Sequence, residues 1–91
     1  MSPPIALARA PLAELHDRFA AALPAVTERA RQAFRRVRCP HDRDDRVADA
    51  ILAAWRAFLR RVTEGVPADP DRLADDAVAV ARRKARRLLP A

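Results

Sequence analysis

The sequence is poor in the residue types on which several classes of fold and site depend. Its 91 residues include one cysteine, one glycine, one tryptophan, three phenylalanines and no tyrosine. The single cysteine, Cys39, excludes an internal disulfide, and the single glycine excludes a glycine-rich phosphate-binding loop. Because aromatic and β-branched residues are scarce, strands are disfavoured.

Long apolar segments are also missing. No apolar run approaches the roughly 20 residues that a helix needs to cross a bilayer. The first residues show no basic stretch followed by an apolar core, which is the pattern of a secretory signal. We therefore expect a cytoplasmic protein without a membrane partner.

Alanine and arginine dominate the composition instead. The chain holds 22 alanines and 17 arginines, and a sequence rich in Ala, Leu and Arg favours helices. Its length leaves room for one domain. We predict an all-α fold, a small bundle of three to four helices at residues 11–89, preceded by a flexible N-terminal arm at residues 1–10.

Prolines and capping residues set the predicted helix bounds. Apolar residues recur at helical spacing on both sides of Pro24. Because the residue before a proline avoids the helical conformation, we predict two helices, at 11–22 and 24–38, with a sharp kink between them. The third helix is predicted to begin with Asp42 or Asp44 as its N-cap and to end near Thr63.

The boundary before the last helix carries more signals. Gly65 suits a left-handed C-cap, and Pro67 prevents continuation of the helix. Asp69 is then an N-cap with Pro70 at the first helical position, which predicts a fourth helix over 70–88. The predicted core combines apolar positions from all the helices: Phe19, Leu23, Val26, Ala30, Phe34, Val37, Val47, Ile51, Ala54, Trp55, Phe58, Val62, Leu73, Ala77, Val80, Ala81 and Leu88.

The net charge of +6 is unevenly distributed. Residues 1–38 carry +4, residues 39–76 carry −3 and residues 77–91 carry +5. Four arginines share the face of the last helix opposite its apolar residues: Arg82, Arg83, Arg86 and Arg87. This cluster either attracts a polyanion or offsets the dipole at the helix C-terminus, and a plain solvated face would explain it as well.

The segment from Asp44 to Arg61 is a strongly amphipathic helix. Its apolar residues fill one arc, which includes Trp55, and for that side chain core packing is favoured over stacking on a ligand. Beside the arc lies a strip of mixed charge that is free to meet a partner: Asp45, Asp49, Arg56 and Arg60.

The order of residue types in this helix is similar to that of a known family. The motif Asp45-x-Val47-x-Asp49-x-x-Leu52-x-Ala54-Trp55-Arg56 resembles the second conserved region of bacterial sigma factors of the extracytoplasmic-function type, whose signature is Asp-x-Val-Gln-Glu-x-Phe-Leu-x-x-Trp. The segment from Leu15 to Phe34, with Pro24 inside, resembles the preceding helix of that region. Val80-Ala81-Arg82 is similar to the Ile-Ala-Arg of its last helix.

The resemblance implies a sigma-region-2-like fold and a role in transcription. In the family, the corresponding helix binds the β′ clamp of RNA polymerase, and the last helix faces promoter DNA. The polymerase-binding residues implied here are Asp45, Asp49, Leu52 and Arg56. The DNA-binding residues implied are Arg82, Arg83, Arg86 and Arg87. The family's helix-turn-helix domain has no counterpart in this sequence, so the likeness is to an isolated or degenerate region-two module.

The chain also departs from the family. Ala48 stands where the family has Gln, which removes one polymerase contact, and Ile51 replaces its aromatic residue. Capture of unstacked bases depends on aromatic platforms. The chain has four aromatic residues, all on predicted apolar faces: Phe19, Phe34, Trp55 and Phe58. We therefore do not expect the protein to melt DNA.

Two functions outside polymerase binding compete with this interpretation. A helical homodimer or adaptor would use the same amphipathic faces, with Leu12, Leu52 and Leu59 at its interface. A nonspecific nucleic-acid binder would use the basic last helix alone and would bind with strong salt dependence.

We expect no enzyme activity, no cofactor and no metal site. Cys39 and His41 supply two potential ligands, whereas a structural zinc ion needs about four. The same two residues lack a third group for nucleophilic catalysis. Asp42 and Asp45 are explained as charges at a helix N-terminus, which the helix dipole favours.

Overall fold

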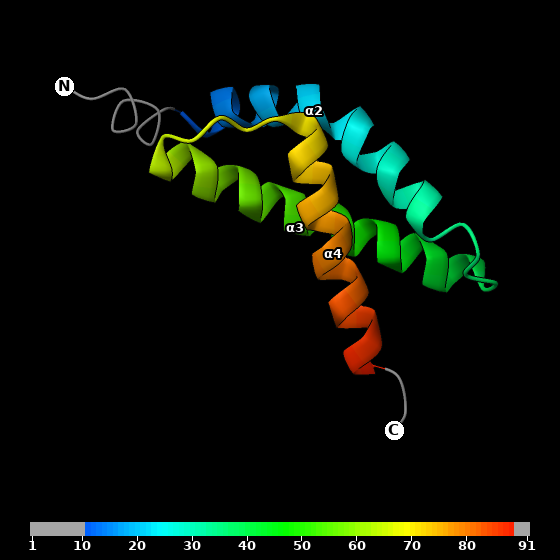
Figure 1. Cartoon of the computed structure of the whole chain (residues 1–91). Coiled ribbons are helices and arrows are strands. Elements are labelled where there is room, and N and C mark those ends of the chain that lie inside the picture. The colour runs from blue at the N-terminus through cyan, green and yellow to red at the C-terminus, as the bar shows by residue number, and fades with distance from the viewer. Residues whose placement is uncertain (1–10, 89–91) are drawn as a thin grey trace.

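The computed structural model describes residues 11–88, which form three helices and no strands. In chain order they are α2 (Leu12–Ala33), α3 (Pro40–Glu64) and α4 (Pro70–Leu88). Helices α2 and α3 run antiparallel, and α4 crosses both of them, with its last turns projecting beyond the pair (Figure 1). The all-helical prediction is confirmed for this part of the chain, whereas the predicted arm at 1–10 and residue 89 lie outside it.

Helix α2 is continuous, so the predicted break at Pro24 is wrong. Proline removes one backbone hydrogen bond and bends a helix at that point without necessarily ending it. The axis of α2 changes direction between its blue and cyan parts in Figure 1. Ala22 and Val26 are buried on the two sides of Pro24, so packing against the other helices holds the bent helix together.

The turn between α2 and α3 also differs from the sequence prediction. Helix α2 ends at Ala33 rather than at residue 38, because the chain turns at Phe34, whose side chain is buried in the core. Helix α3 begins at Pro40, with Cys39 at the N-cap and no side-chain cap. Neither Asp42 nor Asp44 is the N-cap, since Pro40 already suits the first helical position, where its missing N–H costs nothing.

The connection from α3 to α4 agrees with the prediction. Gly65 follows Glu64 with φ 72° and ψ 23°. Its N–H donates to the Val62 carbonyl at 3.2 Å, and the Val66 N–H donates to the Arg61 carbonyl at 2.9 Å. These two bonds form a Schellman motif, which satisfies carbonyls at the end of the helix.

Helix α4 starts with the predicted N-cap. The Arg72 N–H donates to Asp69 Oδ2 at 3.2 Å, and Pro70 occupies the first helical position. A side-chain oxygen here satisfies one of the free N–H groups of the first turn. The predicted bounds, 70–88, are therefore confirmed.

The core lies between the three helices and is rich in alanine. Eight of its sixteen buried residues are alanines, which allow the helix backbones to approach closely: Ala22, Ala30, Ala50, Ala54, Ala57, Ala74, Ala77 and Ala81. The largest fully buried side chains are Leu73 and Val26. Val80 and Leu88, both predicted to be buried, are 39% and 65% exposed, because Val80 lies at the edge of the buried face and Leu88 lies on the projecting end of α4.

An aromatic cluster joins α2 to α3. The Trp55 ring lies 5.1 Å from the His16 ring and 5.2 Å from the Phe19 ring, and it stacks on Phe58 at 5.8 Å. Edge-to-face and offset contacts at such distances favour packing beyond simple burial. Trp55 therefore packs with other side chains at the margin of the core, as predicted.

Candidate functional site

The four residues that the resemblance implies for polymerase binding lie along one strip of α3. Asp45, Asp49, Leu52 and Arg56 follow each other at spacings of four, three and four residues, so they share one helix face. Asp45, Leu52 and Arg56 are exposed, and Asp49 is partly buried. Leu52 is 47% exposed, which leaves a large apolar side chain open between charged neighbours.

Helix α4 turns one side of this strip into a groove. Asp49, Leu52, Ala53, Arg56 and Arg60 line it from α3, and Val80, Ala81 and Lys84 line it from α4. Its volume of about 150 Å³ is below the roughly 300 Å³ that small-molecule sites commonly have. An apolar floor with a charged rim suits one or two side chains of a protein partner better than a free ligand.

The groove also holds an ion pair. Lys84 Nζ donates to Asp49 Oδ1 at 2.9 Å, and the side chains are 51% and 22% exposed. Sequence reasoning missed Lys84 and the exposure of Val80, although the first is the only lysine in the chain. The contact of Lys84 with Asp49 and the exposure of Val80 both depend on how α4 crosses α3. The residue pattern of either helix alone does not indicate that crossing.

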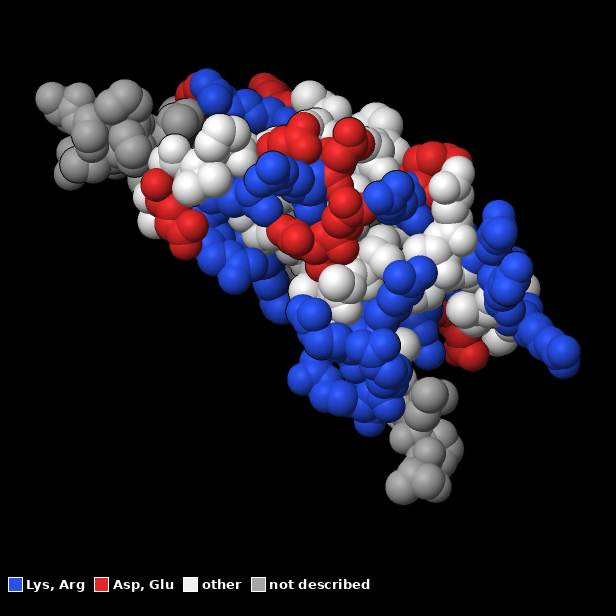
Figure 2. Space-filling model, in the orientation of Figure 1, with Lys and Arg blue, Asp and Glu red and all other residues white. Residues whose placement is uncertain are grey.

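The arginines predicted to bind DNA lie on the projecting end of α4. Arg82, Arg83, Arg86 and Arg87 are all exposed, and no acidic side chain within residues 11–88 pairs with them. Arg83, Arg86 and Arg87 line one shallow, open hollow. Figure 2 shows acidic side chains over the first part of α4 and a dense basic surface over its C-terminal part.

These two predicted sites are neighbours in space. Lys84 lies within the basic segment of α4 and contacts Asp49 of the α3 strip, so a partner on α3 would approach the basic end of α4. Asp45 is the exception, because it does not line the groove and lies one helical turn before Asp49.

The described residues also include the two potential metal ligands named from the sequence, and the three helices can be compared with membrane-spanning segments. Cys39 and His41 are both exposed, and no group of three metal-ligating side chains occurs among residues 11–88. None of the three helices has an apolar stretch of the length that a bilayer crossing requires.

Comparisons with known proteins give no relative. No protein-family model matches the chain, and neither a curated protein nor a solved structure matches it. The arguments about function therefore rest on the residues, their geometry and the sequence resemblance.

Proposed function

We propose that the protein is a non-enzymatic, sigma-region-2-like module that acts in transcription. It binds RNA polymerase through the strip Asp45, Asp49, Leu52 and Arg56, and it contacts DNA through the basic end of α4. The proposal starts from the resemblance of residues 45–56 to the sigma family.

One observation carries the polymerase part of the proposal. The apolar positions of the motif, such as Ala54 and Phe58, are buried, whereas the four positions that the resemblance assigns to the partner stay at the surface or only partly buried. A motif kept only for folding would not require an exposed leucine between an acid and an arginine. This arrangement supports a partner surface on α3.

The chemistry of the strip fits a charged helical partner. Leu52 offers a small apolar contact, and the carboxylates and guanidinium around it can pair with opposite charges on a coiled coil. Interfaces commonly combine such an apolar centre with a polar rim, and complementary charges determine which partner binds and in which orientation. The β′ clamp helices of RNA polymerase are the partner that the resemblance implies.

The basic end of α4 supports the DNA contact. Four unpaired, exposed arginines on a projecting helix end provide charge for phosphates at little desolvation cost. Each neutralised phosphate makes binding more sensitive to salt. The contact is expected to be independent of sequence, because contacts to phosphates carry no information about the bases.

The test is a binding titration against bacterial core RNA polymerase. The double variant Asp49→Arg/Arg56→Glu reverses the charges of the strip and is expected to lose binding. Glu14→Arg/Arg18→Glu is the control, since it also reverses the charges of one acid and one arginine, at an exposed ion pair on α2. No binding by a folded protein at tens of micromolar, or equal loss in both variants, would contradict the proposal.

A second candidate is a nucleic-acid binder without polymerase, which the unpaired arginines of α4 favour. It predicts DNA binding by the protein alone and full loss on replacing Arg82, Arg83, Arg86 and Arg87 by Gln. The homodimer is less favoured, because Leu59 packs partly against the core, which leaves Leu12 and Leu52 of its expected interface exposed. Measurement of the molecular mass over a range of protein concentrations distinguishes a homodimer, whose mass rises with concentration, from a monomeric polymerase binder.

A further inference from the structure

A second basic surface lies where α2 turns into α3. Residues 31–46 contain six arginines and three aspartates. In the orientation shared by Figures 1 and 2, this turn lies at the right, where basic side chains gather apart from the end of α4. The arginines of this surface are Arg31, Arg35, Arg36, Arg38, Arg43 and Arg46.

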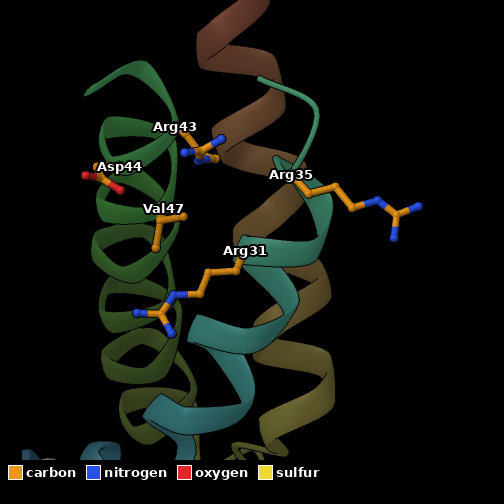
Figure 3. A pocket seen from close by; sticks show the side chains of 5 residues that line it. All are labelled: Arg31, Arg35, Arg43, Asp44 and Val47. Atoms are coloured by element: carbon orange, nitrogen blue, oxygen red, sulfur yellow. The ribbon is translucent and has the colours of Figure 1, made fainter. Parts of the chain in front are cut away.

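This surface contains an open hollow of about 410 Å³ between the two helices. Arg31 and Arg35 line it from the α2 side, and Arg43, Asp44 and Val47 line it from α3. Figure 3 shows Arg31 extending from α2 toward α3, and Arg43 extending from α3 toward α2. The Asp44 carboxylate points to the other side of α3, and Arg35 points away from α3. The guanidinium groups directed to the space between the helices are therefore those of Arg31 and Arg43.

These guanidinium groups are not used to hold the fold together by ion pairs. The ion pairs within residues 11–88 join Arg18 to Glu14, Arg29 to Asp75, Arg61 to Asp76 and Lys84 to Asp49. Arg31 and Arg35 take part in none of them. Arg43 Nη1 donates to the Val37 carbonyl at 3.2 Å, which fixes the side chain and leaves its other N–H groups free to bind a ligand.

Helix electrostatics do not account for the whole cluster. Arg31 lies in the last turn of α2, where a cation is favoured by the helix dipole. Arg43 lies in the first turn of α3, where the same dipole disfavours a cation. The hydrogen bond to the Val37 carbonyl gives Arg43 one role in the turn between α2 and α3, and it places a second guanidinium at the hollow that Arg31 also lines.

We propose that this hollow binds a phosphate group of a nucleic-acid backbone. The planar fork of a guanidinium matches phosphate oxygens in a bidentate manner, and Arg31 and Arg43 approach the same space from different helices. The site extends the DNA contact of the proposed function and rests on nucleic-acid binding, though not on polymerase binding. One nucleic acid would then contact both this hollow and the basic end of α4.

The surroundings favour a nucleic acid over an acidic protein. The large apolar side chains that are exposed within residues 11–88 are Leu12, Leu52, Val66, Val80 and Leu88. None of them lines the hollow. Protein interfaces have an apolar centre, whereas nucleic-acid interfaces are strongly positive. The arginines give this surface such a charge, and the apolar residue that lines the hollow, Val47, is only partly exposed.

The experiment is an anisotropy titration of a labelled duplex of random sequence at several salt concentrations. The variant Arg31→Gln/Arg35→Gln removes two exposed guanidiniums that have no partner. Arg18→Gln/Arg72→Gln is the matched control, because it removes two exposed positive charges from the beginnings of α2 and α4. The first variant is expected to weaken DNA binding about tenfold. It is also expected to reduce the slope of log K against log salt concentration by the contribution of about one neutralised phosphate. The control is expected to change the affinity much less.

Arg43 is tested by a milder change. Arg43→Lys keeps the positive charge and removes the planar fork, so it is expected to weaken DNA binding while far-UV circular dichroism and the fluorescence of Trp55 stay unchanged. The proposal would be overturned by two results together: Arg43→Lys binds DNA as tightly as the parent, and the double variant of the hollow loses no more affinity than the control double variant. Net charge alone would then explain the affinity for DNA.

A further variant separates this proposal from the DNA contact of α4. Replacing Arg82, Arg83, Arg86 and Arg87 by Gln tests the α4 contact by itself. If this variant loses DNA binding and Arg31→Gln/Arg35→Gln does not, the proposed phosphate site in the hollow is overturned and the α4 contact is supported. If only Arg31→Gln/Arg35→Gln loses DNA binding, the phosphate site in the hollow is supported and the α4 contact is not. Competition by polyglutamate as strong as that by unlabelled duplex would overturn the phosphate assignment in favour of an acidic protein.

Discussion

Lys84 of α4 and Asp49 of α3 form an ion pair across the groove between the two helices, with Nζ and Oδ1 2.9 Å apart. Asp49 belongs to the proposed polymerase strip, and Lys84 lies within the basic segment that would face DNA. A partner that needs the Asp49 carboxylate must therefore compete with Lys84. The release of Lys84 would add one cation to the basic end of α4.

The first prediction concerns this pair. Lys84→Met should free Asp49 and tighten binding to core polymerase about fivefold, since an exposed ion pair contributes up to about 1 kcal/mol. The unfolding free energy should fall by less than that amount, because both groups reach solvent. A polymerase titration of Lys84→Met, Asp49→Asn and the double variant gives the coupling. Weaker polymerase binding by Lys84→Met would contradict the competition.

The second prediction concerns the core. Leu73 is fully buried in the first part of α4, and Leu73→Ala is expected to lower the unfolding free energy by about 2–5 kcal/mol through lost burial and a cavity. Leu12→Ala is the control, since Leu12 is 60% exposed and its loss should cost less than about 0.5 kcal/mol. Urea unfolding followed by Trp55 fluorescence measures both. Similar costs for the two variants would argue against the burial of α4 between α2 and α3.

The third prediction concerns the bend in α2. Pro24 is exposed, so replacing it by Ala leaves no cavity and provides an N–H that can donate to the Ala20 carbonyl. We expect Pro24→Ala to raise the unfolding free energy by about 1–2 kcal/mol, less than the ~3 kcal/mol that a proline costs in an unrestrained helix. The gain is smaller because Ala22 and Val26 are buried on both sides of the bend. A lower urea midpoint would mean that the packing of α2 requires the bend.

The sequence was sufficient to predict helix ends where a single residue type determines the local backbone conformation. Gly65 and Asp69 fixed the end of α3 and the start of α4, since a left-handed C-cap and a side-chain N-cap are nearly independent of the rest of the fold. Pro24 was misjudged for the opposite reason. Its local preference to break the helix was overcome by tertiary packing, which no short pattern reveals.

The same contrast between local signals and tertiary packing holds for the core and the candidate site. Phe19, Phe58 and Leu73 were identified by helical spacing and are buried. Ala50 and Ala57 were missed because alanine is frequent throughout the chain and its burial depends on where a neighbouring helix crosses. The groove partners of the α3 strip and the basic hollow at the α2–α3 turn depend on the same crossing geometry, so the sequence alone could not place them.

The last prediction concerns the turn between α3 and α4. Gly65 has φ 72°, and its N–H and that of Val66 bond back to carbonyls in the last turn of α3. A β-carbon in this left-handed conformation costs about 1 kcal/mol, and asparagine tolerates it better than alanine. We therefore expect stability to fall in the order Gly65, Gly65→Asn, Gly65→Ala, with an unchanged dependence of the unfolding free energy on urea. Equal stability of the alanine variant would show that the turn does not hold the left-handed conformation in solution, and the orientation of α4 across α3 would then need another anchor.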